Sequence, residues 1–427
     1  MQIVNFTGNE KTVQKVVLDN GITLIGIENQ TADLIAGRLF FKGTGAMWES
    51  PQKSGLFHLL ATVITKGTKH LSAQEIAEQI ESIGASLGAD ASSDYFVLSL
   101  KTVAADFAQM LKLAGEILRS PTFPEAEIER EKQITRQNIR SQLEQPFNVA
   151  FNQLREIMYP DHPYGLSILG TEETVSQLTR FDIVQCHESY FRPDNLIISL
   201  SGRLTLKEAI ALVEEVFGDW EIPQSSLTVP QIPELVPQPN RAITPQETQQ
   251  SIVMLGYLGS AVKEPNYAAL KLLSTYLGNG LSSRLFVELR EKRGLAYDVS
   301  AFYPTRLEKS QFVIYIGTAP NNTAFALEGL RSEAERLRHT ELTPQELQAA
   351  KNKILGQYAL GKQTNAEMAQ LFGWYETLGL GIEFDTQFQD AIAQVTVEMV
   401  RQVANEYFTE PYISMVGPAA SVNGEWG

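Results

Sequence analysis

The sequence contains two similar halves on either side of a proline-rich segment, and this repeat limits the possible folds more than any other feature. HLLATVITKG at 58–67 can be laid on KLLSTYLGNG at 271–280. TRFDIVQCHESYF at 179–191 lies on TVEMVRQVANEYF at 396–408 without a gap. Because the two matches have nearly the same offset along the chain, they indicate an internal duplication. We therefore expect two homologous domains.

The segment between the halves has the composition of a linker. Residues 222–240, IPQSSLTVPQIPELVPQPN, contain five prolines and no regular apolar period. The sequence therefore predicts an N-terminal domain at 1–221 and a C-terminal domain at 241–427. Each half also ends in a short apolar run that closes on glycine, LIISLSG at 196–202 and YISMVG at 412–417, which predicts a strand in each.

Both helical and strand periods occur within the first half. VVLDNGITLIGIE at 16–28 has an Asp-Asn-Gly turn signal between apolar runs, which predicts a hairpin. SAQEIAEQIESIG at 72–84 has helical spacing, with Ser72 and Glu75 as a capping box. SSDYFVLSLKTV at 92–103 alternates as a strand does. This mixture predicts an α+β fold, in which a mostly antiparallel sheet in each domain is covered by helices.

Composition excludes several classes of protein. The net charge of −15 argues against a nucleic-acid partner, and an acidic surface would instead favour basic peptides. The single cysteine, Cys186, cannot form an internal disulfide and is interpreted as a packing residue. No stretch approaches the roughly 18 continuous apolar residues of a membrane helix, and the first residues lack the pattern of a secretory signal. We therefore expect a soluble cytoplasmic protein, although a processed precursor would look the same.

Six stretches in the two halves carry a resemblance to known proteins. They are FKGTGAMWESPQKSGLFHLL at 41–60, TKGTKHLSAQEIAEQIESIGASLGADASSDY at 65–95, FPEAEIEREKQITRQNI at 123–139, HPYGLSILGTEETVSQLT at 162–179, YFRPDNLIISLSG at 190–202 and YLGNGLSSRLFVELREKRGLAYDVSAFY at 276–303. These stretches resemble one family, the pitrilysin/insulinase metallopeptidases, and in particular its half-length bacterial members similar to mitochondrial processing peptidase. The resemblance covers nearly the whole chain, and its blocks follow one another in the order of the family.

The resemblance implies a zinc-binding HxxEH helix, but most of its functional residues are replaced. In such a helix two histidines at i and i+4 reach one Zn²⁺, and the glutamate between them activates the bound water. His58 occupies the first histidine position, whereas Ala61 stands at the glutamate and Thr62 at the second histidine. The third ligand, a glutamate in the charged helix predicted at 124–146, corresponds to Asn138.

A neighbouring acid is not expected to replace the missing ligand. Glu131 lies seven residues before Asn138, which is about 10 Å along a helix. Ala61 cannot take a proton, so even a stray zinc ion would have no base at that position. We therefore expect His58 to be structural, no zinc in this chain, and no peptide hydrolysis by the chain alone.

The second half retains a pair that the family uses for catalysis. In active members an arginine and a tyrosine seven residues apart reach the zinc site of the other half or of another chain, and the resemblance places them at Arg290 and Tyr297. A tyrosine hydroxyl can stabilise the oxyanion of the transition state, and a guanidinium can orient the substrate. The alternative is that Arg290 forms a surface ion pair and Tyr297 faces the core. The loop at 278–283 lacks the order of a phosphate-binding loop and is shorter than the glycine-rich loop of some non-catalytic family subunits.

Three functions remain open. The first is the non-zinc subunit of a two-chain zinc metalloendopeptidase, with a homologous HxxEH-bearing partner that holds the zinc and with unfolded peptides or presequences as substrates. The second is an inactive scaffold or peptide-binding protein, possibly a homodimer, similar in kind to the core subunits of respiratory complexes. The third is a peptidase whose ligands have moved. The presence of both Arg290 and Tyr297 favours the first, because a pure scaffold would not need them.

Overall fold

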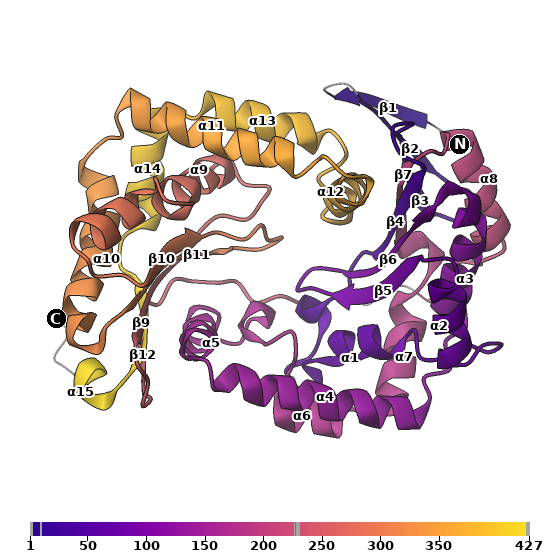
Figure 1. Cartoon of the computed structure of the whole chain (residues 1–427), viewed down its shortest axis with the longest axis horizontal. Helices are drawn as coiled ribbons and strands as arrows, with labels where there is room; N and C mark the ends of the chain where they lie inside the picture. Colours follow the sequence, from indigo (N-terminus) through magenta and orange to yellow (C-terminus); the bar gives the residue numbers. More distant parts are fainter. Residues whose placement is uncertain (1–2, 9–10, 226, 228–230, 424–427) are drawn as a thin grey trace. The chain divides into compact units, whose positions relative to one another are not determined.

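The computed structural model describes residues 3–8, 11–225, 227 and 231–423, and the chain divides into two compact units (Figure 1). Each unit is built around one β-sheet with helices packed against it, so the predicted α+β class is confirmed. Unit 1 comprises 1–139, 166–231 and 359–386, and unit 2 comprises 140–165, 232–358 and 387–427.

Unit 1 contains a seven-stranded sheet of order β1-β2-β3-β7-β4-β6-β5. All its neighbouring strands are antiparallel except β3 and β7, which are parallel. Every residue of the central strand β7 is buried, as its apolar run predicts. The strands are β1 Ile3–Gly8, β2 Lys11–Val17, β3 Thr23–Glu28, β4 Leu34–Phe41, β5 Ser86–Ala91, β6 Phe96–Val103 and β7 Leu196–Gly202.

Unit 2 contains a five-stranded sheet of order β10-β11-β9-β12-β8. Its one parallel pair is β8 with β12, and the other pairs are antiparallel. The order β8-β12-β9-β11-β10 repeats β3-β7-β4-β6-β5 of unit 1 strand for strand, including the position of the parallel pair. The shared topology supports the internal duplication. The strands are β8 Arg241–Pro245, β9 Ser251–Leu258, β10 Asp298–Phe302, β11 Gln311–Thr318 and β12 Tyr412–Gly417.

The local sequence signals in the first half are confirmed. β2 and β3 form the predicted hairpin, and Gly21 takes a φ of 86° in its turn, a conformation that favours glycine. The side chains of Ser72 and Glu75 form both bonds of the capping box at the start of α2. The charged stretch before Pro146 forms a 19-residue helix, α4. Within the described part of 222–240 there is no helix or strand.

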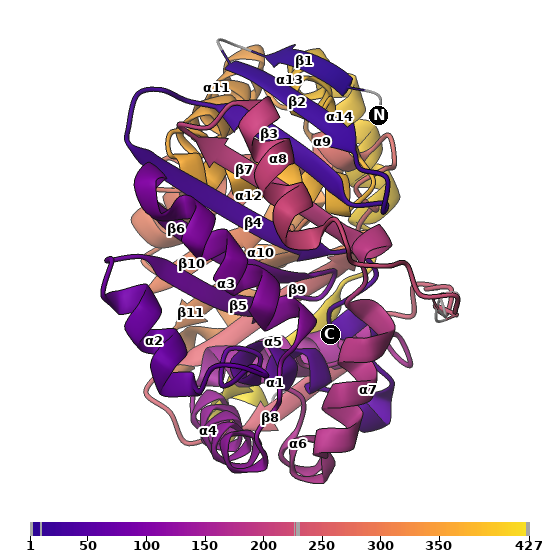
Figure 2. The same cartoon turned by 90° about the vertical axis from the view of Figure 1, so that its right-hand side faces the viewer.

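Helices cover both faces of the sheet in unit 1. Figure 2 shows α3 and α8 lying across the strands, and they pack against β6 and β3. The opposite face of β4, which carries Arg38 and Phe40, packs against α12. The helices of unit 1 are α1 Leu56–Val63, α2 Ala73–Glu81, α3 Phe107–Arg119, α6 Glu172–Gln177, α7 Arg180–Tyr190, α8 Leu206–Phe217 and α12 Asn365–Thr377, and α4 Glu125–Leu143 begins in unit 1 and ends in unit 2.

In unit 2, α9 and α10 pack against strands of the sheet, and α14 packs against both of these helices. A π-helical segment, Phe286–Lys292, follows α9 and precedes β10. The α-helices that lie wholly or mainly in unit 2 are α5 Pro146–Met158, α9 Tyr267–Gly278, α10 Thr323–His339, α11 Pro344–Leu360, α13 Phe384–Gln394, α14 Val397–Tyr407 and α15 Ala419–Val422. Short 3-10 turns lie at Ala46–Trp48, Pro51–Lys53, Ala104–Asp106, Pro163–Gly165, Pro193–Asn195 and Pro320–Asn322.

Each half of the chain gives one helix to the other unit. Helix α5, from the first half, packs on β12, β9 and β8, and the Gln153 amide donates to Ser414 Oγ at 2.8 Å and to the Met415 carbonyl at 3.1 Å. Helix α12, from the second half, packs on β4 and β7 of unit 1. The predicted domains at 1–221 and 241–427 therefore describe the repeat along the chain, whereas the compact units exchange these two helices.

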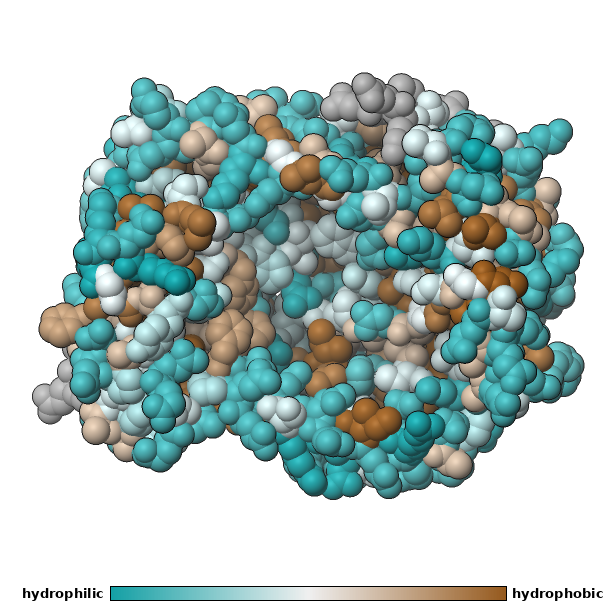
Figure 3. Space-filling model, in the orientation of Figure 1, coloured by the Kyte–Doolittle hydropathy of each residue, from teal (hydrophilic) through white to brown (hydrophobic). Residues whose placement is uncertain are grey.

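The surface drawn in Figure 3 is largely hydrophilic, in keeping with the 20% of charged residues. Among the described helices, none has both the length and the apolar character needed to cross a membrane.

Candidate functional site

Helix α1, which carries His58, starts at a buried acid. The carboxylate of Glu49 accepts the backbone N–H of Gly55 at 2.8 Å and that of Phe57 at 2.6 Å, so it satisfies donors that a helix start leaves free. Burial raises the pKa of Glu49 to about 7, although these hydrogen bonds oppose the shift. Sequence reasoning missed this contact because the acid lies six residues before Gly55 and fits no capping pattern.

The glycine before α1 is required by its surroundings. Gly55 has a φ of 93°, and a Cβ at this position would come within 2.6 Å of the Leu169 carbonyl oxygen. Helix α1 is therefore held in place by a tight backbone contact and by the Glu49 carboxylate.

His58 is half-buried and lies in an acidic environment. Burial lowers the pKa of its imidazole, while the charges of Asp90 on β5 and Glu131 on α4 raise it. The side chain comes from the central part of α1, and its neighbours Phe57 and Leu59 are buried in the core. The imidazole is thus partly buried and within electrostatic reach of two acids.

Ala61 and Thr62, where the sequence resemblance expects the glutamate and the second histidine, are ordinary helix residues in the structure. Ala61 is buried, with 4% of its surface exposed, and belongs to the same apolar cluster as Leu60 and Ile64. The hydroxyl of Thr62 donates to the carbonyl of Leu59 at 2.9 Å, a bond within the helix. Ala61 therefore offers no base, and the Thr62 hydroxyl already has a partner.

On α4 the acid near the motif is Glu131. This residue is 8% exposed, and its carboxylate lies 3.2 Å from Nζ of Lys66. Asn138, the sequence-predicted position of the third ligand, is exposed two turns further along the helix. Sequence reasoning considered Glu131 only as a replacement ligand and rejected it, whereas in the structure its charge raises the pKa of His58. Glu131 follows the buried Ile128 by three residues and precedes the buried Thr135 by four. This helical spacing is the sequence signal that places Glu131 on the buried face of α4.

Zinc is the metal that the family implies, and the residues at these positions do not fit it. His58 offers one imidazole, Ala61 a methyl group, Thr62 a hydroxyl that already donates within the helix, and Asn138 an exposed neutral amide, whereas zinc needs three protein ligands of the His, Cys or carboxylate type. Across residues 3–8, 11–225, 227 and 231–423, no group of three or more His, Cys, Asp or Glu side chains is arranged to hold a metal ion.

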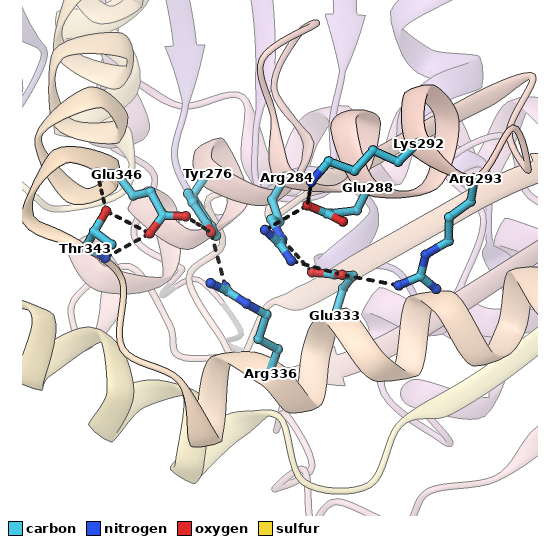
Figure 4. Close-up of polar contacts among 9 residues, drawn as sticks. All are labelled: Tyr276, Arg284, Glu288, Lys292, Arg293, Glu333, Arg336, Thr343 and Glu346. Atoms are coloured by element: carbon cyan, nitrogen blue, oxygen red, sulfur yellow. Dashed lines mark hydrogen bonds and ion pairs between the residues drawn. The ribbon is translucent and has the colours of Figure 1, made fainter.

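The second candidate site rests on the π-helical segment in unit 2, which is fixed to α10 by Glu333 (Figure 4). The carboxylate of Glu333 is 3% exposed and lies 2.7 Å from Nε of Arg284, just before the segment, and 3.9 Å from Arg293, just after it. Glu288 within the segment pairs with Arg284 at 3.0 Å. Segments of π-helix are rare and occur often at functional sites. Here the segment presents Arg290 to solvent.

Neither Arg290 nor Tyr297 has the environment expected of a purely structural side chain, which would be a surface ion pair for Arg290 and a place in the core for Tyr297. The Arg290 guanidinium is exposed and lies 5.0 Å from the centroid of the Phe286 ring. Within the described part of the chain it has no carboxylate partner at ion-pair distance. Tyr297 is 60% exposed, although its backbone N–H donates to the carbonyl of Gly317 in β11 at 2.8 Å. The main chain of Tyr297 is therefore fixed to the sheet, and its ring is free.

The ring of Tyr297 borders an open cavity of about 530 Å³ in unit 2. The other lining residues are Pro146, Thr248, Gln249 and Gln250. Amide and hydroxyl groups of this kind can both donate and accept hydrogen bonds, as the backbone of an extended peptide requires. The surroundings of Tyr297 therefore offer both donors and acceptors of hydrogen bonds.

Two sequence models of one peptidase family match successive parts of the chain. The sequence model described as "Insulinase (Peptidase family M16)" matches residues 26–172, and the one described as "Peptidase M16 inactive domain" matches residues 177–354. The chain belongs to the insulinase family of peptidases, family M16, as its sequence motifs indicate.

Relatives and solved structures match almost the whole chain. The uncharacterized zinc protease YmxG of Bacillus subtilis is 28% identical over 418 residues, covering 96% of this chain and 99% of the relative. An uncharacterized zinc protease of Rickettsia bellii is 25% identical, covering 94% and 96%. The crystal structure of a protease from Helicobacter pylori matches with a TM-score of 0.88 at 25% identity, over 95% of this chain and 99% of that one. A peptidase M16 inactive domain from Pseudomonas fluorescens matches with a TM-score of 0.87 at 25% identity, over 95% and 98%.

Proposed function

We propose that this chain is the non-zinc subunit of a two-chain zinc metalloendopeptidase. The supporting observation is the contrast between its two candidate sites. The positions of the zinc ligands and the base carry Ala61, Thr62 and an exposed Asn138, whereas Arg290 and Tyr297 are both present and both exposed. A chain of this kind needs a homologous HxxEH-bearing subunit to supply zinc, base and water. Zinc then belongs to the partner and not to this chain.

In the complex the role of this chain is to stabilise charge and to position the peptide. When water attacks a peptide carbonyl, negative charge develops on the oxygen, and the Tyr297 hydroxyl donates a hydrogen bond to it. The Arg290 guanidinium has no acid partner among the described residues, so its donors are available for a backbone carbonyl of the substrate. Unfolded peptides are the expected substrates, and the net charge of −15 favours basic ones.

Co-expression with a homologous HxxEH-bearing subunit tests the proposal. Cleavage of a basic peptide is measured for the wild type and for Arg290→Ala and Tyr297→Phe. Tyr297→Phe should lower kcat by about a hundredfold, the typical effect of losing one donor to a developing oxyanion. Arg290→Ala, which removes a contact to the substrate backbone, should lower kcat/KM by about tenfold or more. Arg401→Ala and Tyr407→Phe, on α14, serve as matched controls and should keep the wild-type rate. The proposal fails if the two chains do not associate, or if the Arg290 and Tyr297 variants cleave as fast as the controls.

The second candidate function is an inactive scaffold or peptide-binding protein, possibly a homodimer. The residues around His58 do not suit zinc, and this observation supports the scaffold and the non-zinc subunit equally. The two functions differ at Arg290 and Tyr297, because a scaffold keeps its assembly and its peptide affinity when either side chain is changed. Assembly that is insensitive to both variants, together with the absence of cleavage in the presence of every zinc subunit tested, would favour the scaffold.

A further inference from the structure

A second cavity in unit 2 lies away from Tyr297 and is enclosed by different elements. It has a volume of about 220 Å³ and lies between the end of α9, the start of the π-helical segment and α11. Part of its wall is apolar and is formed by Val287, Ala349 and Ala350. Neither Arg290 nor Tyr297 lines it. The proposed peptidase role does not use this cavity.

One wall of the cavity contains a buried hydroxyl without a partner. Ser283 is 2% exposed, and its Oγ makes no hydrogen bond with any described residue. Its backbone is nevertheless fixed, because the N–H donates to the carbonyl of Gly280 at 3.0 Å. Leaving a buried hydroxyl unpaired costs free energy, so such groups are uncommon in native proteins. A rotation of the Ser283 side chain toward the cavity would let a ligand oxygen supply the acceptor that this hydroxyl lacks.

The charged residues that line the cavity are Arg284, Glu288, Glu346 and Lys353, and the first three have their polar contacts within the protein. The guanidinium of Arg284 is paired with Glu288 and Glu333. The carboxylate of Glu346 accepts hydrogen bonds from the Tyr276 hydroxyl at 2.9 Å and from the Thr343 backbone at 2.8 Å, and Figure 4 shows both groups of contacts.

Lys353, on α11, is the cation without a counter-charge. Its ammonium donates to the Asn279 carbonyl and has no carboxylate partner among the residues that the structure describes. Burial lowers the pKa of this ammonium, since the charged form is partly removed from water. An anion in the cavity would give this ammonium the counter-charge that it lacks. The nearby carboxylates of Glu288 and Glu346 repel a dianion more strongly than a monoanion, so a single negative charge is favoured.

We propose that this cavity binds a carboxylate attached to a small apolar group, namely the C-terminal residue of a peptide or an N-blocked apolar amino acid. The Lys353 ammonium binds one carboxylate oxygen, and the Ser283 hydroxyl donates to the other. The aliphatic side chain packs against Val287, Ala349 and Ala350. The volume of about 220 Å³ suits one such residue and not a folded partner.

Binding of N-acetyl-leucine to the full chain, measured by isothermal titration calorimetry, tests this site. The uncharged N-acetyl-leucine amide and inorganic phosphate are the comparison ligands. Wild type should bind the acid at least about tenfold more tightly than the amide, because a charged hydrogen bond is lost with the carboxylate. Phosphate should bind more weakly than the acid, because it carries more charge and has no apolar group.

Two variants identify the residues that bind the ligand. Lys353→Met should lower the affinity for the acid by about tenfold, and Ser283→Ala by about fivefold. Lys351→Met, on the same helix but bonded to the carbonyl of Ala393, is the matched control and should bind as wild type. Thermal unfolding of Ser283→Ala should occur no lower than that of wild type, because the hydroxyl has no partner to lose.

The site is refuted if wild type binds the acid and the amide equally, or if phosphate binds more tightly than the acid. An equal loss of affinity in Lys351→Met and Lys353→Met would also refute it. If Lys353→Met does not fold, Lys353→Gln provides the same comparison. Because no step depends on peptide cleavage, failure here would leave the proposed peptidase role untouched, and failure of that role would leave this site untouched.

Discussion

The buried carboxylate of Glu333 lies 2.7 Å from Nε of Arg284 and 3.9 Å from Arg293, so one acid on α10 holds both ends of the π-helical segment. The second carboxylate oxygen of Glu333 accepts a hydrogen bond from Arg284 at 3.3 Å, so the contact is bidentate. Bidentate arginine–carboxylate pairs fix orientation as well as distance. A residue that is itself almost inaccessible to solvent therefore ties both ends of the segment that carries Arg290 to α10.

Replacement of Glu333 should destabilise the protein more than loss of a surface ion pair. Glu333→Ala leaves Arg284 without its buried partner and should lower the free energy of unfolding by about 3 kcal/mol, which urea unfolding measures. Glu341→Ala breaks the exposed pair with Arg401 and should change it by less than about 1 kcal/mol. Equal effects of the two variants would show that the Glu333 contact contributes no more than a surface pair.

The stability of unit 1 should depend on pH through Glu49. The pKa of this carboxyl is raised to about 7 in the folded state from 4.5, so between these values the folded chain holds a proton that the unfolded chain has lost. Stability should therefore fall as pH rises from 4.5 to 7, by at most about 3 kcal/mol. Urea midpoints across this range should decrease more steeply for wild type than for Glu49→Gln.

Glu75, whose pKa is shifted in the opposite direction to that of Glu49, provides the control for that experiment. Hydrogen bonds from Ser72 lower the pKa of Glu75, so its contribution to stability is present above the unfolded pKa and is lost as pH falls through the folded one. Glu75→Gln should therefore leave the fall between pH 4.5 and 7 unchanged. If Glu49→Gln keeps the wild-type slope across that range, the buried Glu49 carboxyl is not its cause.

Much of the local structure could be predicted from the sequence, because its signals lie within a few residues. The Ser72–Glu75 capping box and the turn at Gly21 are of this kind. The contacts that build the candidate sites could not be predicted in this way. Glu49 contacts the start of α1 because the chain bends between them, and Glu333 contacts Arg284 from another helix. Such pairs depend on tertiary packing, which periodicity and capping patterns do not encode.

The exchange of α5 and α12 between the units was missed for a related reason. A repeat along the chain and a proline-rich linker predict two halves, and both features are local or depend on sequence similarity. An apolar helix face shows that a helix is covered by something, but not by which sheet. The bonds of Gln153 to Ser414 and Met415 join residues far apart in the sequence, and no spacing rule relates them.

Purified wild type should not carry stoichiometric zinc, and two substitutions should restore a site. Thr62→His places a second imidazole at i+4 from His58, and Asn138→Glu adds a carboxylate at the third ligand position of the family. The double variant should retain close to one zinc per chain after desalting, as measured by plasma emission spectrometry. Thr62→His with Gln137→Glu, which puts the acid on an adjacent exposed position, should retain much less. One zinc per chain in wild type would mean that the ligands have moved elsewhere.

The packing of α12 on the sheet of unit 1 can be tested with two helical glycines. A Cβ at Gly373 would come within 2.5 Å of Phe40 Cε2 and 3.0 Å of Ser199 Cβ, whereas a Cβ at Gly356 in α11 would meet nothing within 4 Å. Gly373→Ala should therefore lower the free energy of unfolding by about 1 to 3 kcal/mol through overpacking. Gly356→Ala should raise it by up to about 1 kcal/mol, because alanine favours an exposed helix position. Urea unfolding of both variants separates helix propensity from packing. A stabilising effect of both would mean that α12 does not lie close against β4 and β7.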